Sequence, residues 1–283
     1  MSNGFKAKPS HLLPEACSIV LTGALTYSLQ AASAPIETIT VFPETTSGVT
    51  LNAGIFIVLI AVTGTVMYLF IKFGLKRLVK TLINFAVFAL LFFLFAWYGT
   101  LYADYLPSIL ISNILVWLCI SLIASLALGW AVYKSKSFLH LAAVIVMGAM
   151  TGTFLGVSIP TLTAAALMLA LAAYDLFAVF KGPIGKIAQS ADLEEFTGAV
   201  FTYRDLTVGM GDMVFYSMLA SNSMINFGPI PFLGASVGLI VGAYLGFKML
   251  EGRDMFPGLP FAMILGLVFM YVTYQITLFL KPA

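Results

Sequence analysis

The sequence predicts an all-α polytopic membrane protein with nine transmembrane helices, forming one membrane domain over residues 1–283. Of the 283 residues, 61% are hydrophobic and only 9% are charged, and the mean hydropathy is +1.03. A soluble domain is about 45–50% apolar and about 25% charged, so one aqueous core could not bury this much apolar surface. The composition therefore excludes a soluble globular enzyme, a disordered protein, a collagen-like fibre and a nucleic-acid-binding protein.

Nine apolar segments have the length of a spanning helix, which needs about 20 mostly apolar residues. They cover residues 14–32, 51–72, 79–98, 109–132, 138–158, 160–180, 207–226, 232–250 and 257–280. Long uncharged runs joined by short polar turns indicate helices, because barrel strands would alternate apolar and polar residues over about ten positions. Between the sixth and seventh segments lies a loop of residues 181–206.

The first segment, residues 14–32, has two interpretations. Lys6 and Lys8 precede it and Ala32-Ser33-Ala34 ends it, an arrangement that resembles a signal peptide with its cleavage site. Pro35 follows that site directly and should hinder cleavage. We therefore expect the first helix to be retained.

The basic residues predict how the chain is oriented. Thirteen of the 14 Lys and Arg residues lie in the N-terminal tail or in every second loop, all on one side of the membrane. The positive-inside rule places that side in the cytoplasm. The N-terminus and the 181–206 loop are then cytoplasmic and the C-terminus is outside. One missed or extra helix would scramble this regularity, so it also supports the count of nine.

Glycines recur every four residues along the eighth segment, at Gly234, Gly238, Gly242 and Gly246. Small residues at this spacing let two membrane helices approach closely. We expect this segment to pack tightly against a neighbouring helix.

Two of the 12 acidic residues have an unusual position in the chain. The other ten lie in loops or at helix ends, whereas Asp175 and Asp212 lie inside apolar helices. A charge at the bilayer centre costs at least ~2.5–3.5 kcal/mol on the insertion scale. Asp175 lies five residues before the cytoplasmic end of its helix, and Asp212 about five residues into the next, antiparallel one. At a rise of about 1.5 Å per residue both lie about 7.5 Å deep, so their carboxyls could face each other.

Such a pair is compatible with three roles. Two close carboxyls in a low dielectric would share one proton, which supplies a base and an acid for hydrolysis by an activated water. The same acids could instead relay protons in a proton-coupled transporter or ion channel, or bond to helix backbones as structural groups. Depth and spacing alone leave all three open.

Local sequence around the acids favours a site built from three helices. Asp212 follows Gly209-Met210-Gly211, and glycines beside an intramembrane acid weaken the helix and let other backbone come close. The last segment starts, also on the cytoplasmic side, with Pro257-Gly258-Leu259-Pro260, whose prolines remove backbone donors. We expect these motifs to converge with Asp175 on a water-accessible cavity that opens to the cytoplasm.

Three motifs in this order resemble the YD, GxGD and PALP motifs of presenilins and signal peptide peptidases, the GxGD intramembrane aspartyl proteases. They are Tyr174-Asp175, Gly209-Met210-Gly211-Asp212 and Pro257-Gly258-Leu259-Pro260. The resemblance implies that Asp175 and Asp212 are the catalytic pair and that the other motif residues shape the site and position substrate. The predicted orientation matches the presenilin branch, so the chain is most similar to a microbial, archaeal presenilin homologue. Gly258 stands where the family usually has Ala, which we expect to be a conservative change in size.

Other classes of intramembrane protease lack their signatures here. His11 and His140, the only histidines, form no HExxH zinc motif, and no GxSG motif of a rhomboid-type serine protease occurs. No nucleotide-binding motif is present, so we expect neither a cofactor nor a metal. The resemblance implies single-pass transmembrane substrates, cut within the lipid of a microbial cell (plasma) membrane. The sequence leaves open whether the chain acts alone, as a homo-oligomer or with other subunits.

Overall fold

The computed structural model describes residues 5–102, 105, 114–134, 138–180, 198–253 and 255–280. These ranges contain a 3-10 helix, nine α-helices and two strands. In chain order they are η1 (Pro9–Leu12), α1 (Leu13–Ala31), α2 (Thr46–Lys72), α3 (Lys76–Leu101), α5 (Ile114–Tyr133), α6 (Phe138–Ser158), α7 (Thr161–Phe180), β1 (Val200–Tyr203), β2 (Leu206–Gly209), α9 (Met210–Phe227), α10 (Pro229–Leu250) and α11 (Leu259–Leu280).

Each of the nine predicted helices has its counterpart in this order, which confirms the all-α fold class. The predicted start of the seventh helix at residue 207 is wrong, because β2 occupies Leu206–Gly209 and pairs antiparallel with β1. The predicted 181–206 loop is also partly wrong, since β1 lies within it; its residues 181–197 fall outside the described ranges. Burial alternates along β2, where Leu206 and Val208 are buried and Thr207 is exposed, and Phe201 of β1 is buried too. The two segments are rich in β-branched and aromatic residues, which favours strands over helix.

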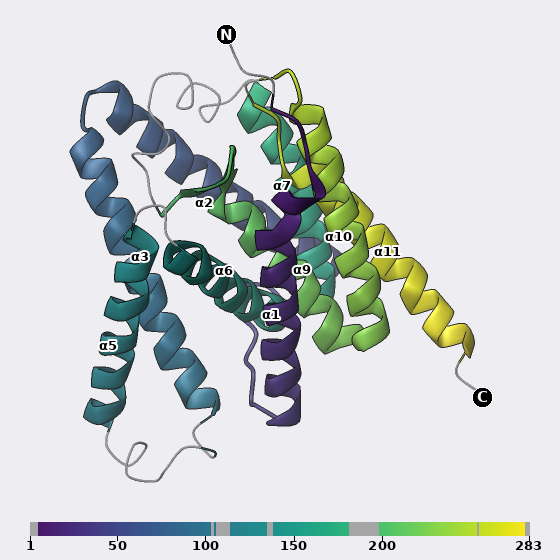
Figure 1. Ribbon diagram of the computed structural model, residues 1–283. Coiled ribbons are helices and arrows are strands. Elements are labelled where there is room, and N and C mark those ends of the chain that lie inside the picture. The colour runs from purple at the N-terminus through teal and green to yellow at the C-terminus, as the bar shows by residue number, and fades with distance from the viewer. Residues whose placement is uncertain are drawn as a thin grey trace.

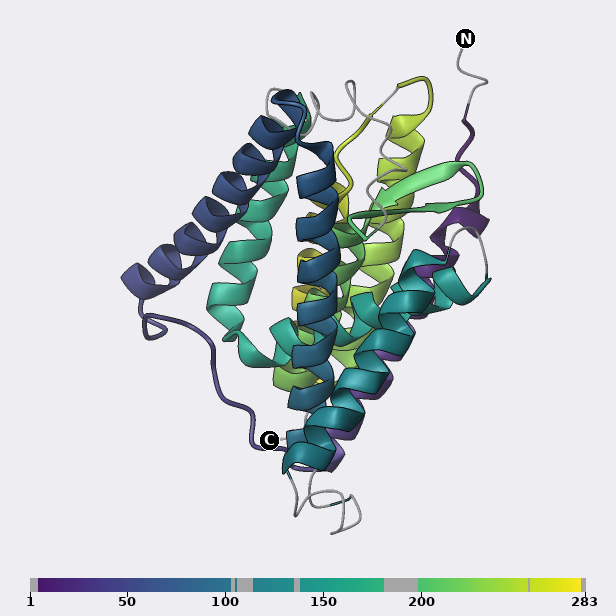
Figure 2. The same cartoon turned by 90° about the vertical axis from the view of Figure 1, so that its left-hand side faces the viewer.

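Three helices form the centre of the bundle. α1 packs on both α6 and α9, and α6 packs on α9. On one flank lie α10, α11 and α7, with α2 resting on α7; on the other lie α3 and α5 (Figure 1). Figure 2 shows that the β1–β2 hairpin lies at the end of the bundle where α1 begins, opposite to the end where α11 finishes.

Glycines of α6 let α9 into the centre of the bundle. Gly148, Gly152 and Gly156 all face α9, and a β-carbon at Gly152 would fall 2.2 Å from Cβ of Ser217. A side chain there would force the helices apart. This close approach fixes the depth of α9 among its neighbours.

The stripe of glycines on α10 faces α11, which confirms the predicted tight packing against a neighbouring helix. β-Carbons at Gly238 and Gly242 would lie 2.4 Å from the carbonyl oxygen of Leu265 and from Cα of Ala262. Gly246, one turn on, is less crowded, with the Gly258 carbonyl oxygen 3.8 Å away. The tight contact places the start of α11 beside the end of α10.

Buried hydroxyls join α1 to α9. The Ser18 and Ser217 hydroxyls lie 2.9 Å apart, and those of Thr26 and Ser221 lie 2.8 Å apart. Interhelical hydrogen bonds of this kind hold helices in register where the surroundings are apolar. They make α1 an integral part of the bundle.

The outer surface is apolar. Large side chains point away from the bundle, including Phe138 and Phe279, which are 86% and 90% exposed. Eight of the helical stretches, all but α9, are long and apolar enough to cross a membrane. So much exposed apolar surface suits lipid rather than water. The chain is a multi-pass integral membrane protein.

Candidate active site

A cavity of about 580 Å³ lies at the hairpin end of the bundle. Asp175 and Asp212 both line it, together with β2, the last turn of α10 and the connection from α10 to α11. The cavity reaches the exposed residues Asp205 and Arg253, so it opens at this end of the bundle.

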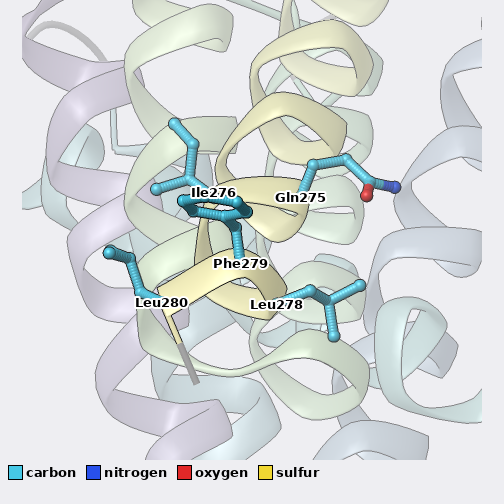
Figure 3. A pocket seen from close by; sticks show the side chains of 5 residues that line it. All are labelled: Gln275, Ile276, Leu278, Phe279 and Leu280. Carbon is cyan, nitrogen blue, oxygen red and sulfur yellow. The ribbon is translucent and has the colours of Figure 1, made fainter. Parts of the chain in front are cut away.

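A second hollow lies at the far end of α11 and offers no comparable chemistry. Figure 3 shows its five side chains splaying around one helix instead of converging on a point. Four of them are apolar and the fifth is Gln275. It lacks an acid, a base and a nucleophile.

Asp175 lies one turn from the end of α7 and is half-buried. Its Oδ2 accepts a hydrogen bond of 3.1 Å from the backbone N–H of Leu259, the first residue of α11. The amide at the start of α11 therefore holds this carboxyl against the cavity wall. An amide at a helix N-terminus is well suited to an ionised carboxylate.

Asp212 lies in the first turn of α9, whose N-cap is Gly209 in an extended conformation. The backbone N–H groups of a first helical turn stabilise negative charge nearby. Asp212 is also in electrostatic contact with Asp175. Two helices that are separate in sequence thus bring both carboxyls to one cavity.

The turn at residues 257–259 links the two acids. Leu259 binds Asp175, while the carbonyl oxygen of Gly258 accepts a hydrogen bond of 3.0 Å from the Tyr216 hydroxyl, one turn after Asp212. A β-carbon at Gly258 would lie 2.4 Å from Oδ2 of Asp212. The missing methyl leaves room for the carboxyl, and a methyl at this position would require the Asp212 side chain to move.

No family model matches the chain. Over 163 residues it is 26% identical to Presenilin-B of Dictyostelium discoideum, which covers 54% of this chain and 33% of that protein. The chain thus spans about a third of the length of this curated relative.

Two crystal forms of a presenilin family intramembrane aspartate protease superpose on the chain along nearly its whole length. The TM-scores are 0.64 and 0.63 at 21% and 20% identity, over 93% of this chain and 97% and 96% of the solved ones. The chain has the presenilin fold. This confirms the predicted resemblance to presenilins in fold, and the transporter alternative finds no support in these similarities.

Within the presenilin fold, only some of the predicted site residues reach the cavity. Gly209, Gly211, Pro257 and Gly258 line it beside the two acids. Three others are buried around it: Met210, Leu259 and Pro260. Tyr174 turns toward α2, where its hydroxyl would lie 3.7 Å from a β-carbon at Gly64.

Glu15 is a third buried acid, and the sequence analysis missed it by counting it among the acids at helix ends. It lies in the first turn of α1, is 1% exposed, and neither carboxyl oxygen has a hydrogen-bond partner among the described residues. Asp212 and Tyr216 are both in electrostatic contact with it. The signal in the sequence was a polar stripe of Glu15, Ser18, Thr22 and Thr26 along one helix face.

Residues at the cavity mouth were also missed. Phe5, Asp205, Arg253 and Phe256 come from three segments that the sequence treats as tail and loops. The Arg253 guanidinium lies over the Phe256 ring, 5.5 Å from its centroid. No local pattern marks them, because only the folded chain brings them together.

The arrangement suits acid–base chemistry on a bound amide. Two carboxyls share one open, largely apolar cavity, and the described residues contain no group of three or more His, Cys, Asp or Glu side chains placed to hold a metal ion. A carboxyl pair in a low dielectric can keep one proton between them. Such a pair can activate water and protonate a carbonyl oxygen at once.

Proposed function

We propose that the protein is a presenilin-like intramembrane aspartyl endopeptidase, with Asp175 and Asp212 as its catalytic residues. The observation that carries this proposal is that both carboxyls line one cavity opening at the end of a membrane-spanning bundle. The presenilin fold and the partial match to Presenilin-B support it.

The mechanism needs one proton shared by the pair. The ionised aspartate takes a proton from water, the hydroxide attacks the carbonyl carbon, and the protonated aspartate donates to the carbonyl oxygen. This gives a gem-diol. One of its hydroxyls then gives a proton to the aspartate that protonated the carbonyl oxygen, the amide nitrogen takes the proton held by the other aspartate, and the C–N bond breaks. The pair ends as it began, holding one proton.

Gly258 and Tyr216 contribute to the site by holding the turn at residues 257–259 in place. The Tyr216 hydroxyl holds the Gly258 carbonyl, which keeps the turn at 257–259 next to both carboxyls. Tyr216 therefore acts as a positioning residue through this turn.

The substrates we expect are single-pass transmembrane proteins. A helix hides its amides in internal hydrogen bonds, so a stretch must unwind before water can attack. Residues of β2 line the cavity beside the acids. An unwound stretch of substrate is extended, and extended backbone can pair with a strand such as β2. Substrates with weak helix near the cleavage point should be cut fastest.

The basic loops support an orientation with the cavity facing the cytoplasm of a microbial cell, within its plasma membrane. Cleavage would then occur near the cytoplasmic face, by a retained nine-helix chain of one membrane domain. The exposed apolar side chains of α2 and α5 support assembly as a homo-oligomer.

The test is cleavage of a single-pass substrate in liposomes by the wild type, Asp175→Asn, Asp212→Asn and Glu37→Gln. Glu37 is exposed in the α1–α2 connection and serves as a matched carboxyl-to-amide control. We expect each aspartate variant to abolish cleavage and the control to keep it. Cleavage that survives in either aspartate variant, with all proteins equally folded, contradicts the proposal. Proton or ion flux through the wild type without cleavage would favour a transporter instead.

A further inference from the structure

The N-terminal segment, residues 5–12, crosses the mouth of the cavity and binds two elements that are distant in sequence. Ala7 donates its backbone N–H to Oε1 of Glu251, at the end of α10, over 2.9 Å. On the other side, Ser10 and His11 contact the turn between β1 and β2. Phe5 itself lines the cavity.

His11 makes the most specific of these contacts. It is 1% exposed, and its Nδ1 accepts the backbone N–H of Lys8 at 3.2 Å. The ring proton is thereby assigned to Nε2, which donates to Oδ1 of Asp205 over 2.9 Å. The Phe5 ring stacks on the imidazole with centroids 5.3 Å apart, so the orientation of His11 is fixed on three sides.

The turn that His11 binds is unfavourable by itself. Pairing of Tyr203 with Leu206 leaves a loop of only Arg204 and Asp205, and Arg204 has a φ of +58°. Two-residue hairpin loops use glycine or asparagine at such positions because a β-carbon is disfavoured there. Both loop residues bind the N-terminal segment, since the Arg204 guanidinium donates to the Ser10 hydroxyl. These contacts offset the unfavourable backbone.

The turn at Arg204 and Asp205 leads directly into β2, which forms one wall of the cavity. From Asp205 the chain enters β2, whose four residues Leu206–Gly209 all line the cavity. β2 then passes directly into α9, with Asp212 in its first turn. A displacement of the turn therefore moves the strand that forms this wall of the cavity.

We propose that residues 5–12 are a positioning element of the active site, which binds Arg204 and Asp205 and so holds β2 in place as a wall of the cavity. The inference rests on the proposed protease function. His11 and Asp205 are positioning residues, because their hydrogen bonds go to each other and to Lys8 and not to the reacting carboxyls.

The experiment compares Asp205→Ala and Asp205→Asn with the wild type. Asn keeps an oxygen that can accept the His11 proton, whereas Ala removes it. The Asp205 side chain is 59% exposed, so both variants should fold. We expect Asp205→Ala to lower kcat/KM about tenfold, mainly through a higher KM, because the wall orients substrate without taking part in the chemistry. Asp205→Asn should stay within about twofold of the wild type.

Two variants of His11 test the other side of its contact with Asp205. His11→Gln keeps an N–H near the position of Nε2, whereas His11→Met does not. His11→Met should reproduce the effect of Asp205→Ala, and the double variant should be no worse than either single one, since both remove the same contact.

Hydrogen exchange of the hairpin amides separates this inference from the proposed function. Exchange in β1 and β2 should be faster in Asp205→Ala than in Asp205→Asn, whether or not the protein cleaves any substrate. Equal exchange in these two variants overturns the inference. So does faster exchange with unchanged kcat/KM, because the hairpin would then move without affecting the site. A wild type that exchanges as expected but cleaves nothing refutes the protease function instead.

Discussion

Replacing Gly258 by alanine should damage the site although alanine is the residue that presenilins usually carry there. In this chain the new β-carbon would lie 2.4 Å from Oδ2 and 3.1 Å from Cγ of Asp212, whereas ordinary contact begins at 3.4 Å. The carboxyl must therefore move by about 1 Å to reach ordinary contact.

That displacement sets the size of the effect. The obstructing atoms belong to the end of a side chain, so the fold can accommodate the methyl at little cost. A misplacement of about 1 Å at a reacting group costs about 100-fold in rate. This corresponds to about 2.7 kcal/mol of transition-state stabilisation. We expect kcat to fall by this factor with the free energy of unfolding nearly unchanged.

The assay is cleavage of a single-pass substrate in liposomes, combined with thermal unfolding of each variant. Gly54→Ala is the control, because a β-carbon at Gly54 on α2 would meet no atom within 4 Å. A Gly258→Ala variant with wild-type kcat refutes the reasoning. It would mean that the Asp212 carboxyl moves aside freely, as the alanine found in relatives would suggest.

Three further outcomes are expected. Glu15→Leu should raise the unfolding temperature or leave it unchanged. A buried carboxyl without a hydrogen-bond partner destabilises the fold by about 1–3 kcal/mol, and the substitution removes that carboxyl. A lower unfolding temperature in detergent contradicts this prediction. Gly242→Ala should lower the free energy of unfolding by about 1–3 kcal/mol through overpacking against α11, while Gly54→Ala should not. Hydrogen bonds from its own backbone amide and then from His11 hold the pKa of the Asp205 carboxyl below its ordinary value of 3.8. A lowered pKa means that Asp205 contributes stability above its unfolded-state pKa and loses that contribution as the pH falls through the folded-state pKa. Protection of the hairpin amides, measured as exchange relative to the intrinsic rate at each pH, should therefore fall at low pH in the wild type but not in Asp205→Asn; an equal pH dependence of protection in both contradicts this prediction.

Much of the membrane architecture follows from the sequence because it depends on local composition. Apolar runs of sufficient length must become helices in lipid, where each backbone amide needs an internal partner. The helix count, the depths of Asp175 and Asp212 and the packing face of the α10 glycines follow from one segment at a time. The hairpin at residues 200–209 was missed because its short strands adjoin an apolar helix and are specified by their pairing with each other.

Only the tertiary structure decided how the site is assembled. That Asp175 binds the amide of Leu259, that Tyr216 holds the carbonyl of Gly258, and that Asp212 fills the space left by the missing methyl all depend on contacts between separate helices. The same holds for Glu15, which has the sequence position of a residue at a helix end but lies buried and interacts electrostatically with Asp212. Hydropathy and spacing fix the depth of a residue along its own helix. Which residues of neighbouring helices share that depth and face is set by close packing across the bundle, which no single segment encodes.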